Sequence, residues 1–226
     1  LLWKVFLPMI TSPVAGFLLG IVVMLLLWAI IAGMAKAGGW LGRLARPRIV
    51  NAFFGKAQIV SAAYMGFAHG HNDAQKTMGI IAMTLIGAEA TGALNDLPSW
   101  LAFMHPDASA GDGIAMWIVL TCAVVMAAGT ASGGWKIIKT LGHKMVKLQP
   151  IDGFAAETAS ATILITASNF GMPVSTTHSI STAIMGVGFG KNPRKLKLGV
   201  IERILWAWIL TIPAAGGIAY GLLRLL

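Results

Sequence analysis

Long apolar segments separated by short polar ones run through the whole sequence. Uninterrupted apolar runs cover about residues 12–34 and 113–131, and a further apolar span covers about 200–223. Apolar segments with polar interruptions cover about 51–90 and 151–189. An α-helix needs about 20 apolar residues to cross the hydrocarbon core of a bilayer, and residues 12–34 reach that length without a single charge. The pattern therefore predicts an all-α integral membrane protein built as a polytopic helical bundle.

Composition supports a membrane protein and changes the interpretation of the charge. Of the 226 residues, 57% are hydrophobic and only 11% are charged, whereas soluble domains typically carry about 25% charged residues. The formal net charge of +9 would indicate nucleic-acid binding in a soluble protein. Here the basic residues lie in loops between apolar spans, so we expect the lipid bilayer as the partner and no nucleic acid.

Three basic stretches alternate with the apolar segments and predict the topology. They contain Lys36, Arg43, Arg46, Arg48 and Lys56; Lys136, Lys139, Lys144 and Lys147; and Lys191, Arg194, Lys195, Lys197 and Arg203. The loop over 91–112 instead contains Asp96, Asp107 and Asp112, with no lysine or arginine. Because cytoplasmic loops are enriched in lysine and arginine, we predict that the three basic loops are cytoplasmic and that the acidic loop lies outside.

This topology constrains the two interrupted segments. Residues 51–90 would join inside to outside and are far too many for one straight crossing, so that segment must be tilted, broken or partly outside the lipid. Residues 151–189 would join inside to inside. Each of their two arms has about 16 residues, which is short for a full span. We therefore predict a re-entrant hairpin that turns near the middle of the membrane.

The interruptions themselves are polar: AHGHND at 68–73 and NFGMPVSTTH at 169–178. Non-helical backbone at membrane depth is tolerated only where it is buried in protein or lines a watery cavity. An apolar run follows each interruption, so we expect one broken helix resuming over about 74–88 and one hairpin helix over about 174–188, with Pro173 near its start. The N-terminus of a helix binds oxyanions through unpaired N–H groups and its positive dipole end.

The side chains beside these expected helix starts predict a pocket for a small anion. Ser175, Thr176 and Thr177 add hydroxyl donors at the second start, and Lys76 is the one lysine or arginine that we place inside a span. Ionisable residues inside a membrane are costly and therefore functional by default. Asp73, Lys76 and Glu157 are the three predicted there.

A carboxylate in an anion pocket needs an explanation, and two remain open for Asp73. It could accept a hydrogen bond from a protonated oxyanion, which favours hydrogen phosphate over sulfate, or it could hold a coupling cation or proton. Glu157 precedes a polar stripe at helical spacing that could line an ion path. The stripe consists of Thr158, Thr162, Thr166 and Asn169. We assign Asp73, Glu157, Thr158 and Asn169 to the coupling ion.

Structural roles and other functions are the alternatives. Asn72 and Asp73 could cap a helix, the hydroxyls could bond backbone or neighbouring helices, and Glu157 could pair with a buried donor.

His69, His71 and His178 match no closed zinc site, so we predict no metal site. Ser175 with His178, or HGHND, could belong to an intramembrane metal-dependent hydrolase. No Gly-x-Ser-x-Gly motif surrounds the serine, and we expect no enzyme. A channel would differ by flux independent of ion gradients.

The interruptions resemble the signatures of the inorganic phosphate transporter (PiT) family. The matching segments are HGHND at 69–73, PVSTTH at 173–178, GGWKIIKTLGHK at 133–144, GFAAETASA at 153–161 and SPVAGF at 12–17. The resemblance implies that Asn72, Asp73, Ser175, Thr176 and Thr177 contact phosphate, and we assign Gln75 and Lys76 to the same substrate-binding site. Gln75 and Lys76 stand where many family motifs have small apolar residues or asparagine, which leaves the coupling ion open.

The resemblance also implies the fold and function of the whole protein. It predicts that residues 1–226 form a single transmembrane domain, the C-terminal half of an inverted-repeat transporter from a bacterial inner membrane. The function would be secondary active symport of inorganic phosphate, free or as a metal–phosphate complex, by alternating access. The coupling ion would be H⁺ or Na⁺, with no cofactor. A missing N-terminal half or a second copy, giving a homodimer, would complete the site; a sulfate permease of the same family is the alternative.

Overall fold

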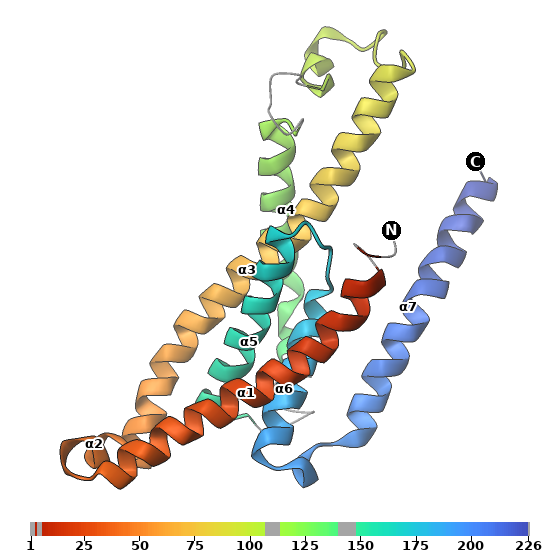
Figure 1. Cartoon of the computed structure of the whole chain (residues 1–226). Helices are drawn as coiled ribbons and strands as arrows, with labels where there is room; N and C mark the ends of the chain where they lie inside the picture. Colours follow the sequence, from red (N-terminus) through yellow and green to blue (C-terminus); the bar gives the residue numbers. More distant parts are fainter. Residues whose placement is uncertain (1–2, 4–5, 107–113, 140–147, 226) are drawn as a thin grey trace.

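The computed structural model describes residue 3 and residues 6–106, 114–139 and 148–225, and every regular element in them is helical. Figure 1 shows the elements in chain order. They are α1 (Leu7–Ala37), α2 (Gly39–Leu44), α3 (Pro47–Ala90), η2 (Ser99–Met104), α4 (Met116–Lys139), α5 (Pro150–Asn169), α6 (Thr176–Lys191), η4 (Pro193–Lys195) and α7 (Leu198–Leu225). The predicted all-α class is confirmed. Three helical segments are long and apolar enough to cross a membrane: α1, Met116–Gly134 of α4, and α7.

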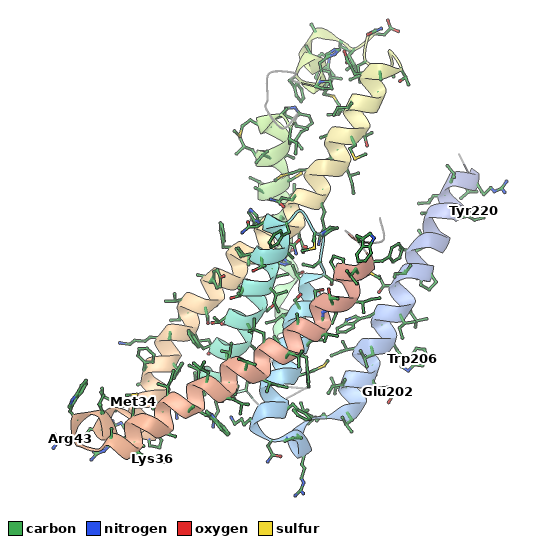
Figure 2. All side chains as sticks on the ribbon, viewed as in Figure 1. Met34, Lys36, Arg43, Glu202, Trp206 and Tyr220 are labelled. Atoms are coloured by element: carbon green, nitrogen blue, oxygen red, sulfur yellow. The ribbon has the colours of Figure 1, made fainter. Side chains whose placement is uncertain are left out.

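The helices gather two of the basic stretches at one end of the bundle. Figure 1 places α2 and the connection between α6 and α7 at the lower end, and the loop after α3 at the opposite end. Lys36 and Arg43 lie together at that lower end (Figure 2). Two of the basic stretches thus lie at one end and the loop after α3 lies at the other, as the predicted topology requires. That the basic end faces the cytoplasm stays a prediction. Asp107, Asp112, Lys144 and Lys147 lie outside the described residues.

The predicted broken helix is wrong, because α3 is continuous through HGHND. Its 44 residues span about 66 Å, more than twice the roughly 30 Å of a hydrocarbon core. A helix of this length must therefore tilt in the membrane or extend beyond the lipid, as the sequence analysis predicts for residues 51–90. Gly70 has no positive φ, so it lowers helix propensity by only about 1 kcal/mol. The neighbouring polar side chains find partners on the α5–α6 hairpin, and they therefore do not need to cap their own backbone.

The second interruption is confirmed as a break between two packed helices. The chain leaves α5 through Gly171, whose φ of 62° is left-handed and favours glycine. It then runs without helical structure over residues 172–174. Ser175 caps α6, because its Oγ accepts a hydrogen bond from the backbone N–H of His178 at 3.3 Å. The helix begins two residues later than predicted, and Pro173 lies in the connection rather than in the first turn.

Small residues bring α1 close against α6 and hold the hairpin in place. A Cβ on Gly186 would overlap the backbone carbonyl of Phe17, and one on Gly20 would overlap the carbonyl of Ala183. Close approach through small residues is typical of helix packing in lipid. α3 lies along the other side of α5. The tip of the hairpin is thereby fixed beside the middle of α3.

The last helix contributes little to this core. None of the described residues of α7 is buried, and Figure 1 shows the helix standing apart from the bundle. Glu202, Trp206 and Tyr220 follow its length (Figure 2). Trp208 makes a ring contact with His178 of α6, with 3.9 Å between ring centroids. An apolar, uncovered helix of this kind is suited to lipid or to further protein.

Candidate functional site

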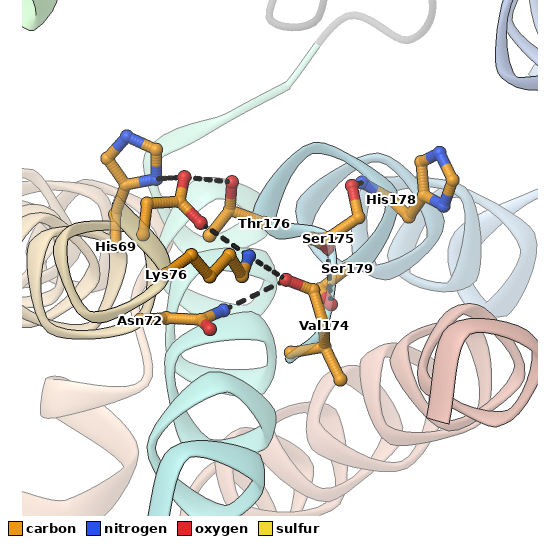
Figure 3. A network of polar contacts seen from close by, with 9 residues as sticks. His69, Asn72, Lys76, Val174, Ser175, Thr176, His178 and Ser179 are labelled. Atoms are coloured by element: carbon orange, nitrogen blue, oxygen red, sulfur yellow. Dashed lines mark hydrogen bonds and ion pairs between the residues drawn. The ribbon is translucent and has the colours of Figure 1, made fainter. Parts of the chain in front are cut away.

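The Asp73 carboxylate is the centre of a polar network that joins α3 to the start of α6 (Figure 3). Its Oδ1 accepts a hydrogen bond from Lys76 Nζ at 2.8 Å, and its Oδ2 accepts one from Thr176 Oγ1 at 3.1 Å. His69 Nδ1 lies 3.3 Å from the same Oδ2. Lys76 and His69 are one helical turn away on either side of Asp73, so a continuous α3 presents all three on one face.

The backbone carbonyl of Val174 is the second acceptor in this network. It receives hydrogen bonds from Asn72 Nδ2 at 3.1 Å and from Lys76 Nζ at 2.5 Å. Val174 lies in the non-helical connection before α6, where its carbonyl has no helical partner. Asn72 is buried, with 3% of its surface exposed. The two α3 side chains therefore satisfy the backbone of the hairpin tip, which would otherwise carry a costly unpaired carbonyl.

The first turn of α6 contains the three hydroxyl residues that the sequence analysis assigns to anion binding. The first N–H groups of a helix have no partner inside it, and they carry the positive end of its dipole. The Thr176 hydroxyl proton is engaged by Asp73, whereas Thr177 is exposed and lines a cavity. Ser175, Thr176 and Thr177 are thus brought together, with different roles for their hydroxyls.

That cavity has a volume of about 470 Å³ and lies among α3, α4, α5 and α6. Its polar lining consists of Gln58, His69, Thr130, Glu157, Thr176 and Thr177. Among the described residues that line it, Asp73 and Lys76 do not appear. The contacts of Thr176 and His69 with Asp73 connect this pair to the cavity lining. A small oxyanion in this cavity would meet the α6 start and Glu157 directly, and the Asp73–Lys76 pair through Thr176.

Two residues that the sequence analysis missed hold Glu157 in the cavity wall. Ser61 Oγ donates to Glu157 Oε2 at 2.5 Å and lies 3.0 Å from the Gln58 carbonyl oxygen. Gln58 packs where a Cβ on Gly153 would stand, so that glycine makes room for it. A signal was available: residues 58, 61, 65, 69, 72 and 76 recur at helical spacing. Because the sequence analysis interpreted HGHND as a helix break, it did not treat these residues as one face of a continuous helix.

Other predicted site residues do not join this network. Gln75 is exposed and its Nε2 lies 3.3 Å from His71 Nε2, away from Asp73. The hydroxyls of Thr162 and Thr166 donate to backbone carbonyls four residues earlier. They, together with Asn169, lie on an exposed face of α5, and Thr158, which begins the stripe, is half-buried. The residues predicted to bind the coupling ion therefore do not lie together. Glu157 lines the cavity, whereas the threonine stripe and Asn169 lie largely on the exposed face of α5.

The histidines are also separated. His69 contacts Asp73, His71 contacts Gln75, and His178 packs against the ring of Trp208. Within the part of the chain that the structure describes, no three histidine, cysteine or acidic side chains are grouped as metal ligands would be. The histidine contacts favour helix packing and hydrogen bonding as the roles of these side chains.

The tip of the α5–α6 hairpin thus lies beside the middle of α3, next to the partly buried Asp73–Lys76 pair, and such meetings of interrupted helices with ionisable groups are common in membrane transporters. A family model described as "Phosphate transporter family" matches residues 1–219. The chain belongs to this family. Because the family consists of transporters and not of enzymes, the hydrolase alternative is set aside.

Similar proteins agree with this assignment. A probable low-affinity inorganic phosphate transporter of Bacillus subtilis is 37% identical over 226 residues, which are 99% of this chain and 60% of that protein. One of Rhizobium meliloti is 37% identical over 206 residues, covering 91% of this chain and 53% of that protein. The chain thus spans about half the length of the curated relatives it matches.

A solved structure shares the fold. The sodium-dependent phosphate transporter superposes with a TM-score of 0.66 at 22% identity, covering 92% of this chain and 62% of that chain. At this identity the likeness shows the fold alone. The arrangement of α1 to α7 is therefore one that a phosphate transporter adopts.

Proposed function

We propose that this chain forms part of a secondary transporter that moves inorganic phosphate across the cell membrane by alternating access. The observation that carries the proposal is the first turn of α6, where Thr176 and Thr177 line a cavity that Glu157 also lines and where Thr176 donates a hydrogen bond to Asp73. Phosphate binds at Ser175, Thr176 and Thr177, and Asn72, Asp73 and Lys76 hold that turn in place. The basic end of the bundle faces the cytoplasm. In a bacterium, the protein lies in the inner membrane.

Glu157 supplies the second element of the mechanism. Its carboxylate lines the same cavity as Thr176 and Thr177 and is oriented by Ser61. It accepts a hydrogen bond from the P–O–H group of hydrogen phosphate, or it holds the coupling proton or sodium ion. Sulfate carries no proton at neutral pH, so a carboxylate at this position favours phosphate over sulfate. The cargo is phosphate, either free or with a bound metal.

The site is completed by further protein. Inverted-repeat transporters form their substrate site between two halves, and α7 leaves an uncovered apolar surface here. A second half of the same protein, or a second copy in a homodimer, faces the α6 start from the other side of the cavity.

The test is uptake by the full-length protein in liposomes. Labelled phosphate should accumulate when a proton or sodium gradient is imposed, and labelled sulfate should not. Thr176→Ala should reduce phosphate uptake strongly, and a matched substitution at an exposed threonine of α3, Thr84→Ala, should not. Sulfate uptake without phosphate uptake would favour a sulfate permease, and gradient-independent flux would favour a channel. Equal uptake by Thr176→Ala and the unaltered protein would refute the site.

A further inference from the structure

Two oxygen atoms from different elements converge on one cation at the hairpin tip. Asp73 Oδ1 on α3 and the Val174 carbonyl oxygen before α6 lie 2.8 and 2.5 Å from Lys76 Nζ. Carbonyl oxygens of unwound segments, together with polar side chains, are where secondary transporters coordinate sodium ions. Here the cation between these two oxygens is the ammonium group of Lys76 instead of a bound ion.

The hydrogen bonds of Lys76 hold its ammonium group between Asp73 and Val174, and not in the cavity proposed to bind the anion. An ammonium has three donors, and Lys76 directs two of them to Asp73 and Val174. Lys76 is absent from the described residues that line the cavity at Thr177. Its side chain is 35% exposed and that of Asp73 is 22% exposed, so the pair is partly shielded from solvent.

The charge balance at Asp73 is already complete. One carboxylate and one ammonium sum to zero, and both Thr176 and His69 contact the second carboxylate oxygen. A sodium ion at Asp73 would have to displace the ammonium or lie beside it, and like charges at that separation repel. Removing the ammonium, by contrast, would leave a partly shielded carboxylate and a carbonyl without their cation.

We propose that Lys76 is a tethered cation that takes the place of a sodium ion at Asp73, so this half of the transporter binds no sodium there. The proposal rests on the proposed transport function and names the coupling property of the same site. It resolves the earlier question about Asp73, because the cation that this carboxylate holds is Lys76. Any coupling ion must then bind elsewhere, for example at Glu157.

The experiment measures the sodium response of the purified full-length protein, independently of transport. Thermal stability and ²²Na⁺ binding are compared in sodium and in choline for the unaltered protein, Lys76→Ala and Lys76→Gln. We expect a saturable sodium-dependent rise in melting temperature of roughly 3 °C or more in the uncharged variants. The part of this rise that exceeds the sodium response of the unaltered protein should disappear when Asp73→Asn is added. Lys76→Arg should respond to sodium as the unaltered protein does, and so should Lys56→Ala, at an exposed lysine of the same helix.

Two outcomes would overturn the proposal. One is a sodium response of the unaltered protein that Asp73→Asn abolishes, because sodium would then bind at Asp73 beside Lys76. The other is that folded Lys76→Ala and Lys76→Gln gain no sodium response. Failure of phosphate uptake by the unaltered protein would instead count against the transport function, and the binding measurement distinguishes the two failures.

Discussion

Lys76 Nζ lies 2.8 Å from Asp73 Oδ1, one turn away on the same helix, and 2.5 Å from the carbonyl oxygen of Val174 on the hairpin. This relationship neutralises the carboxylate beside a site suited to an anion. It also ties the hairpin tip to α3, so the electrostatics of the site and the position of α6 depend on the same pair.

Asp73→Asn should therefore weaken both stability and transport. It leaves the Lys76 ammonium without its counter-ion, a loss of about 1–3 kcal/mol in the free energy of unfolding. Phosphate uptake in liposomes should fall at least tenfold. Adding Lys76→Gln should recover part of the stability, measured by thermal denaturation in detergent, without recovering uptake. Asp96→Asn, at an exposed acidic residue, is the control; an equal effect there would contradict the prediction.

Thr177→Val should reduce phosphate affinity. Thr177 is exposed into the cavity, and a hydrogen bond to a charged ligand contributes about 1.5–3 kcal/mol. The KM for phosphate should rise roughly tenfold or more, with little change in melting temperature. Thr162→Val is the matched control, because the Thr162 hydroxyl already donates to the Thr158 carbonyl on an exposed face. A larger rise in KM for Thr162→Val would place the ion or substrate path on the α5 stripe.

Ser61→Ala should disturb coupling through Glu157. The Ser61 hydroxyl fixes one carboxylate oxygen, so its loss lets Glu157 change orientation. Gradient-driven accumulation of phosphate should fall by roughly threefold to tenfold, and Glu157→Gln should reduce it further while phosphate–phosphate exchange persists. Ser132→Ala is the control, since that exposed hydroxyl donates to the Gly129 carbonyl. If exchange and accumulation fall together, Glu157 acts in phosphate binding instead of coupling.

Gly186→Ala should loosen the packing of α1 on α6. A Cβ there would overlap the Phe17 carbonyl, whereas one on Gly190 of the same helix would have its nearest neighbour at 3.7 Å. Overpacking typically costs about 1–3 kcal/mol, so the melting temperature should fall for Gly186→Ala. Gly190→Ala should leave it unchanged or slightly higher. Equal melting temperatures for the two variants would show that α1 does not approach α6 this closely.

Lys191→Met should destabilise the base of the hairpin. Lys191 Nζ lies 2.7 Å from Asp152 Oδ2, and the aspartate side chain is only 1% exposed. Removing the lysine leaves a buried unpaired carboxylate, which costs about 3–5 kcal/mol. Asp152→Asn in the same protein should restore most of the melting temperature. Lys197→Met, at an exposed lysine, should have little effect, and a failure of the double variant to recover would mean that the pair is not coupled.

Local sequence patterns determined the helices of this protein. The apolar runs at 12–34, 113–131 and 200–223 correspond to α1, α4 and α7, because length and hydropathy alone fix such segments. The break before α6 was also predictable. Gly171 adopts a left-handed φ, Pro173 disfavours helix at the residue before it, and Ser175 caps the next helix. Each of these effects acts over a few residues.

Tertiary structure decided the continuity of α3 and the partners of its polar face. Asn72 and Lys76 are satisfied by Val174, which is 102 and 98 residues away in the chain, and no local pattern reveals such a partner. The same holds for Ser61, which meets Glu157 across 96 residues. Residues that cap helices and turns in isolation therefore remain inside one helix here, because the packed hairpin supplies better hydrogen-bond partners than their own backbone. The sequence determined which segments are helical and where the chain must turn; the packing of the hairpin on α3 decided that Lys76 neutralises Asp73.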